Sequence, residues 1–171
     1  MDAPKPAAIH PVLTSASIAR RLISFSYESL LLAALLMLAG LVFAAVTHNF
    51  HAPWLRAALQ GYLLAVAGAY FVRCWRRGGQ TLPMKTWRLR VVSQDGRPLT
   101  MQRALFRYTT ALLCVAPIAL CAAAAALRHD LLLAAATVGG ASLTFGWALL
   151  DRDRQFLYDR LAGTRVVNSH S

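Results

Sequence analysis

Long apolar segments alternate with short polar ones along this chain. No Asp, Glu, Lys or Arg occurs in four stretches, which are residues 29–55, 57–72, 108–127 and 131–150. The hydrocarbon core of a bilayer is about 30 Å thick, so a helix of about 20 apolar residues is long enough to cross it. We therefore predict an all-α membrane protein with four transmembrane helices, at about residues 28–47, 54–75, 107–127 and 131–150.

The segments outside these spans are short, with one exception. Residues 1–15 contain three prolines and no periodic pattern, which predicts a disordered tail. Residues 76–106 form the long polar loop between the second and third spans. The predicted organisation is one membrane domain over residues 16–167, with a C-terminal tail at 168–171.

A small β element is expected in the long polar loop. Apolar and polar residues alternate over 87–92, and Asp95-Gly96 supplies a tight-turn signal. Residues 97–101 are then expected to return as the second strand of a β-hairpin. After the fourth span, residues 151–162 are expected to continue as a helix that ends before Gly163. Residues 164–167 are expected to add a third strand.

Composition and charge placement support this interpretation and orient it. The chain is 57% hydrophobic and only 15% charged, whereas soluble proteins carry about 25% charged residues. Soluble enzymes, secreted disulfide scaffolds and free nucleic-acid-binding domains are therefore excluded as first interpretations. Of the 18 basic residues, only Arg56 and Arg128 fall in turns on one side of the predicted spans.

The other basic residues all lie on the side of the predicted membrane that holds both termini and the long polar loop, and the net charge of +11 is concentrated there. Basic residues in short loops stay in the cytoplasm during insertion, so both termini and the long loop are expected to be cytoplasmic. Anionic lipid headgroups are the expected partners of this charge, and nucleic acid is not.

Candidate functional residues gather at the predicted cytoplasmic boundary. Arg21 and Glu28 are seven residues apart, which places them on one face of a helix. An ionisable residue such as Glu28 in a membrane helix is costly unless paired, and marks a candidate site. Asp159 in the tail is expected to join this polar cluster, with Arg103 and Arg107 as partners. No catalytic residues, metal site or cofactor is predicted, since neither a phosphate-binding loop nor an H-E-x-x-H motif is present.

Several motifs resemble those of the RDD family, small bacterial inner-membrane proteins named for one arginine and two aspartates. The opening motif is Arg21-Leu22 followed by an acid seven residues later, and Arg103 and Arg107 match the arginines before the third span. The other matching segments are a central loop, Gly79-Gln80-Thr81-Leu82 with Leu89–Val92 and Asp95-Gly96, and a closing motif, Tyr158–Val167.

Two positions depart from the family pattern. Glu28 stands where the family has its first aspartate, and Pro83-Met84 replaces a common Gly-Lys pair. Because proline lacks a backbone donor and the lysine charge is absent, an anion-binding role for this turn is disfavoured. The resemblance implies a multi-pass protein of the bacterial inner membrane, and transport such as sodium/proton exchange has been proposed for some family members.

Two functional hypotheses follow. In the first, the chain is a non-catalytic membrane module that assembles with or regulates a partner protein, and the Arg/Glu/Asp cluster is a structural network. In the second, it is a transporter component in which Glu28 and Asp159 bind a cation or proton in alternation. Small residues four apart within the spans, such as Gly61-Ala65-Ala69, are consistent with helix packing inside the chain or with a homo-oligomer.

Overall fold

Four long helices dominate the computed structural model, which describes residues 15–47 and 52–169. They are α1 (Ile18–Thr47), α2 (Pro53–Arg77), α4 (Met101–Arg128) and α5 (Leu131–Leu150). All four are long and apolar enough to cross a membrane, which confirms the predicted fold class. Except for Ser15, the predicted N-terminal tail lies outside the described residues.

Local sequence signals explain where the helices begin. Pro53 occupies the first turn of α2, where its missing N–H costs nothing. The Thr100 hydroxyl accepts a hydrogen bond from the backbone N–H of Arg103 and caps α4. The Asp130 carboxylate accepts the N–H of Leu132 at 2.8 Å and caps α5. Helices α1 and α4 start earlier than the predicted spans, because the polar residues before each span are also helical.

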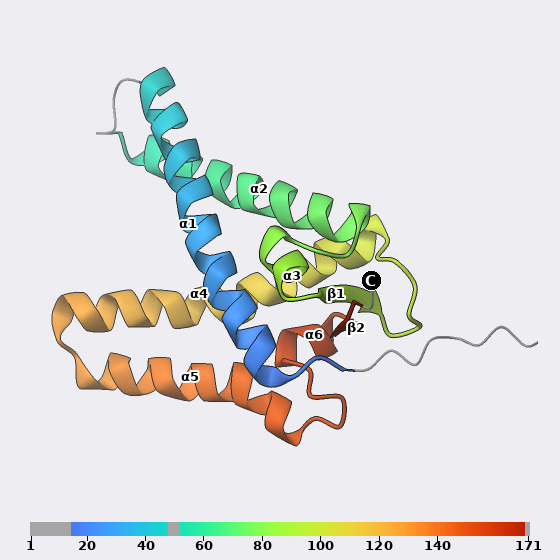
Figure 1. Ribbon diagram of the computed structural model, residues 1–171. Helices are drawn as coiled ribbons and strands as arrows, with labels where there is room; N and C mark the ends of the chain where they lie inside the picture. Colours follow the sequence, from blue (N-terminus) through green and yellow to red (C-terminus); the bar gives the residue numbers. More distant parts are fainter. Residues whose placement is uncertain (1–14, 48–51, 170–171) are drawn as a thin grey trace, which may run out of the picture.

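The long helices are arranged as two pairs that meet near one end of the molecule. Helices α4 and α5 run side by side as a hairpin, and α2 packs against both α1 and α4 (Figure 1). A Cβ on Gly68 would lie 3.0 Å from the ring of Tyr108, and one on Gly140 would lie 3.1 Å from Ile118. These two glycines therefore provide the close helix contacts, whereas Gly61 has no atom within 4 Å of such a Cβ.

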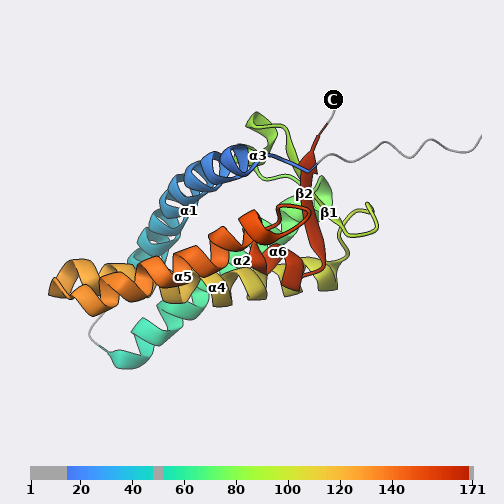
Figure 2. The same cartoon turned by 90° about the horizontal axis from the view of Figure 1, so that it is seen from below.

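Four short elements gather at one end of the helices, which we call the polar end (Figures 1 and 2). They are α3 (Leu82–Thr86), β1 (Leu89–Ser93), α6 (Leu157–Leu161) and β2 (Thr164–Asn168). The described chain also begins there, since Ser15 forms an isolated bridge with Val167. Both ends of the described chain and the long polar loop therefore lie on one side of the helices.

The predicted β element is present, but its second strand is not the one expected. Strand β1 pairs antiparallel with β2, with Leu89 opposite Asn168 and Ser93 opposite Thr164. The predicted return strand at residues 97–101 is wrong: this segment leads directly into α4. Pro98 in that segment lacks a backbone donor for a strand ladder. The valines of β2 are instead buried against the core, so the C-terminal strand takes this place.

The predicted helix at residues 151–162 is also interrupted. Helix α5 ends at Leu150, and a loop with Arg154 at a φ of 53° precedes the short helix α6. The Asp151 carboxylate accepts the N–H of Gln155 at 2.9 Å, which stabilises this loop in place of a continued helix. The interruption turns α6 back toward α4, and this places Asp159 inside the protein.

Candidate functional site

A buried group of three charged side chains joins three helices at the polar end. Asp159 of α6 accepts hydrogen bonds from Arg21 of α1 and from Arg107 of α4, one on each carboxylate oxygen. Side-chain exposure is 0% for Asp159, 2% for Arg21 and 3% for Arg107. We call these residues the charge triad. Its parts come from both ends of the chain and from its middle, so it fastens α6 to the membrane helices.

Aromatic rings and further acceptors surround the two arginines of the triad. The guanidinium of Arg21 lies 4.1 Å from the centre of the Phe156 ring, and it also donates to the carbonyl of Arg154. The guanidinium of Arg107 lies 4.8 Å from the ring centre of Trp75 and donates to the Thr164 hydroxyl at 2.5 Å. Cation–π contacts and hydrogen bonds thus offset part of the loss of hydration.

Glu28 lies apart from the triad. Its carboxylate accepts hydrogen bonds from the hydroxyl of Thr81 and from the hydroxyl of Tyr70, the latter at 2.9 Å. Within the part of the chain that the structure describes, Glu28 forms no ion pair. The expectation that Glu28 joins one polar cluster with Arg21 and Asp159 is therefore wrong. These neutral donors tie α1 to α2 and to the residue that precedes α3.

Arg103 does not join the cluster either. It forms an ion pair with Asp95 at 3.6 Å, and the two side chains are 49% and 64% exposed. Arg103 also donates to the hydroxyl of Ser93, which bridges the start of α4 to the end of β1. An exposed pair of this kind contributes at most about 1 kcal/mol to stability. Only Arg21, Arg107 and Asp159 of the five predicted residues form one buried group.

The Gly79-Gln80-Thr81 loop has a structural explanation. Gly79 has a φ of +69°, and a Cβ there would lie 2.6 Å from the carbonyl oxygen of Val91, so only glycine fits. The carbonyl of Gly79 accepts the N–H of Val91 at 2.7 Å, and the Gln80 side chain donates to the carbonyl of Leu89 at 2.7 Å. The loop is thereby held along β1, which places the Thr81 hydroxyl at Glu28.

The second predicted motif, Asp95-Gly96, forms a turn at the end of β1. Gly96 has a φ of 76°, and its N–H donates to the carbonyl of Ser93 at 2.8 Å. The turn signal was therefore correct, although it does not connect two paired strands.

Sequence reasoning missed two residues that hold the site together. Gln155 is fully buried, and its side chain accepts the N–H of Val166 at 2.9 Å and donates to the carbonyl of Asp153 at 2.8 Å. It thus satisfies the backbone of β2 on the side away from β1. Tyr70 lies within the second span, and its hydroxyl donates a hydrogen bond to Glu28. Neither residue belongs to a motif that the sequence analysis used, so no local signal marked them.

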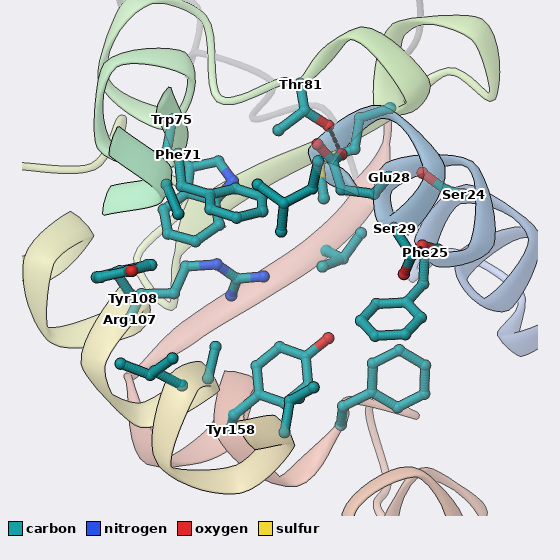
Figure 3. A pocket seen from close by; sticks show the side chains of 18 of the residues that line it. Ser24, Phe25, Glu28, Ser29, Phe71, Trp75, Thr81, Arg107, Tyr108 and Tyr158 are labelled. Atoms are coloured by element: carbon teal, nitrogen blue, oxygen red, sulfur yellow. Dashed lines mark hydrogen bonds between the residues drawn. The ribbon is translucent and has the colours of Figure 1, made fainter. Parts of the chain in front are cut away.

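A pocket of about 450 Å³ lies between α1, α2 and α4 and is closed by the polar end (Figure 3). Arg21, Glu28, Thr81 and Arg107 line its polar part. Tyr158 also lines it, and burial together with the negative charge of Asp159 raises the pKa of this phenol, so that it stays protonated. Leucine, alanine and valine side chains of the three long helices, together with aromatic rings such as those of Phe25 and Phe71, line most of the remainder. The pocket is therefore amphipathic.

The relation to known proteins agrees with this geometry. The RDD family matches residues 15–163, which include the charge triad, Glu28 and the Gly79–Thr81 loop. Comparison with curated proteins and with solved structures gives no match. The family match covers most of the chain, and on that basis the chain belongs to the RDD family.

Proposed function

We propose that this chain is a non-catalytic membrane module that assembles with or regulates another protein. The observation that carries this proposal is the charge triad, in which both carboxylate oxygens of Asp159 are bound by arginines of the same chain. Removing one partner from a buried ion pair costs about 3–5 kcal/mol, so these charges are suited to fixing an architecture. They are poorly suited to releasing and rebinding an ion in each cycle.

We place the polar end in the cytoplasm and the helices in the bacterial inner membrane. The support is the distribution of basic residues, which are concentrated in the segments that meet at the polar end. Both termini then lie in the cytoplasm, as does the loop between α2 and α4.

The surface offered to a partner is basic. Six exposed cations follow one another between the end of α2 and the start of α4: Arg76, Arg77, Lys85, Arg88, Arg90 and Arg97. We call this set the basic loop surface. Its charge suits anionic headgroups or an acidic surface on a partner protein.

Site-specific photo-crosslinking in intact cells tests this proposal. A photoreactive residue at position 76, 88 or 97 is expected to give a discrete cross-linked product of defined mass. The double variant Arg88→Glu with Arg97→Glu, probed from position 76, should lose that product because the surface charge is reversed. Arg128→Glu, at the opposite end of α4, is the matched control and should keep it. Absence of any discrete product from all three positions would contradict the proposal.

A second candidate function is cation or proton exchange. It is favoured by Glu28, a carboxylate that lines the pocket and forms no ion pair within the described residues. Asp159 is held by two arginines, so exchange would depend on Glu28 alone. The purified protein in liposomes would have to give a cation-driven pH change that Glu28→Gln abolishes. Equal signals from wild type and variant would remove this candidate.

A further inference from the structure

The pocket between α1, α2 and α4 is long, with a polar part and an apolar part. Along α1, the residues that line it extend from Arg21 to Leu36. At 1.5 Å per residue this is about 22 Å, a large part of the thickness of one bilayer. Leu63 and Ala67 of α2 and Val115 of α4 complete the apolar wall. This shape fits an acyl chain whose headgroup lies at the polar end.

The polar part of the pocket has separate positive and negative sites. The charge triad contains two arginines and one aspartate, which leaves one surplus positive charge. Glu28 is an acidic side chain with no cation paired to it in the described chain. Figure 3 shows Arg107 and Glu28 on different helices around the pocket, with the Arg107 guanidinium directed toward its interior. A complementary ligand must therefore carry both charges.

Arg107 lines the pocket, and one of its two terminal nitrogens has no hydrogen-bond partner among the described residues. Its Nη1 donates to Asp159 and Thr164, whereas its Nη2 makes no hydrogen bond with any described residue. Because a donor without an acceptor in a buried site costs about 1–3 kcal/mol, an acceptor with several oxygens placed at Nη2 would stabilise this site. A phosphate group is such an acceptor, and it binds arginine strongly.

We propose that the pocket binds a zwitterionic phospholipid with a primary ammonium headgroup. The phosphate lies at Arg107, the ammonium donates to the Glu28 carboxylate, and one acyl chain follows the apolar wall between α1 and α2. The hydroxyls of Thr81 and Tyr70 hold the carboxylate in place for the ammonium. A primary ammonium offers hydrogen-bond donors to this carboxylate, and a quaternary one does not. This binding does not depend on whether the chain assembles with a partner.

Lipid retention measured by native mass spectrometry tests the proposal. Delipidated protein is mixed with equal amounts of phosphatidylethanolamine, phosphatidylcholine and phosphatidylglycerol that have the same acyl chains. Phosphatidylethanolamine is expected to be retained about tenfold more than either of the others, which corresponds to about 1.4 kcal/mol. Equal retention of all three, or preference for phosphatidylglycerol, would overturn the proposal.

Changes in ligand and protein identify the contacts. N-acetylated phosphatidylethanolamine has lost the ammonium and should lose the preference on the wild-type protein, a result that requires no variant to fold. Glu28→Gln should abolish the same preference, with Asp95→Asn as the control.

Ala67→Phe fills the pocket and should lower retention of every lipid, whereas Ala65→Phe on the exposed side of α2 should not. If the wild-type protein retains the acetylated lipid as well as phosphatidylethanolamine, or if the two phenylalanine variants retain equal amounts of lipid, the proposed binding mode is refuted.

Discussion

Replacing Asp159 by asparagine tests the charge triad most directly. The substitution keeps the size of the side chain and removes the only negative charge among the three residues. Asparagine can still accept from one arginine, but its amide group then points N–H donors at the other. Two buried guanidinium groups, 2% and 3% exposed, are left without a counter-charge.

The expected loss of stability is large. Removing one partner of a buried ion pair costs about 3–5 kcal/mol, and here a single substitution affects two pairs, so we expect at least the upper end of that range. Arg107→Met should cost less than Asp159→Asn, because it leaves Arg21 and Asp159 as a balanced pair. The free energy of unfolding can be measured by SDS titration in mixed micelles, followed by tryptophan fluorescence, to which Trp75 beside Arg107 contributes.

Asp153→Asn is the matched control. Asp153 pairs with Arg160 at 3.0 Å, and the two side chains are 38% and 43% exposed, so the loss should be about 1 kcal/mol or less. If Asp159→Asn unfolds within about 1 kcal/mol of Asp153→Asn, the triad does not fasten the polar end, and the argument for a structural charge group fails.

Three further predictions concern the loop, Glu28 and the orientation. Gly79→Ala should lower the free energy of unfolding more than Gly163→Ala. Both positions have a positive φ, which costs an alanine about 1–2 kcal/mol, but only at position 79 would the new Cβ lie against a carbonyl oxygen. Thermal unfolding in detergent would show whether the two variants differ. By the same measurement, Thr81→Val should cost about 1–3 kcal/mol because Glu28 loses a donor, and exposed Thr86→Val should cost little. Green fluorescent protein fused to either terminus should fluoresce, and a dark fusion at one end would contradict the proposed orientation.

The four membrane helices were predictable because their signals are local. The length of each apolar stretch locates its span, and the start of α5 agrees with the prediction because Asp130 caps the first turn of this helix. The predicted β-hairpin is wrong because the choice of strand partner is not determined locally. The Asp95-Gly96 turn is a local signal, but which strand pairs with β1 depends on burial of valines more than 60 residues further along the chain.

The charge triad shows the same limit. Residues seven apart share a helix face, yet they lie about 10 Å apart along the axis, so their side chains can reach different partners. Arg21 therefore contacts Asp159, and Glu28 contacts Thr81. No spacing rule connects Arg21 to a residue at the other end of the chain. The resemblance to the family indicated the residues, and the tertiary fold determines how they pair.

The late position of Asp159 in the chain has a consequence for biogenesis. Chains are synthesised from the N-terminus, so all four spans have been translated before the counter-ion of Arg21 and Arg107 is made. Until then the newly inserted helices hold two uncompensated charges at the membrane boundary. Translation of α6 therefore completes the charge triad, and a product that stops after Leu150 would be exposed to membrane proteases although every span is present.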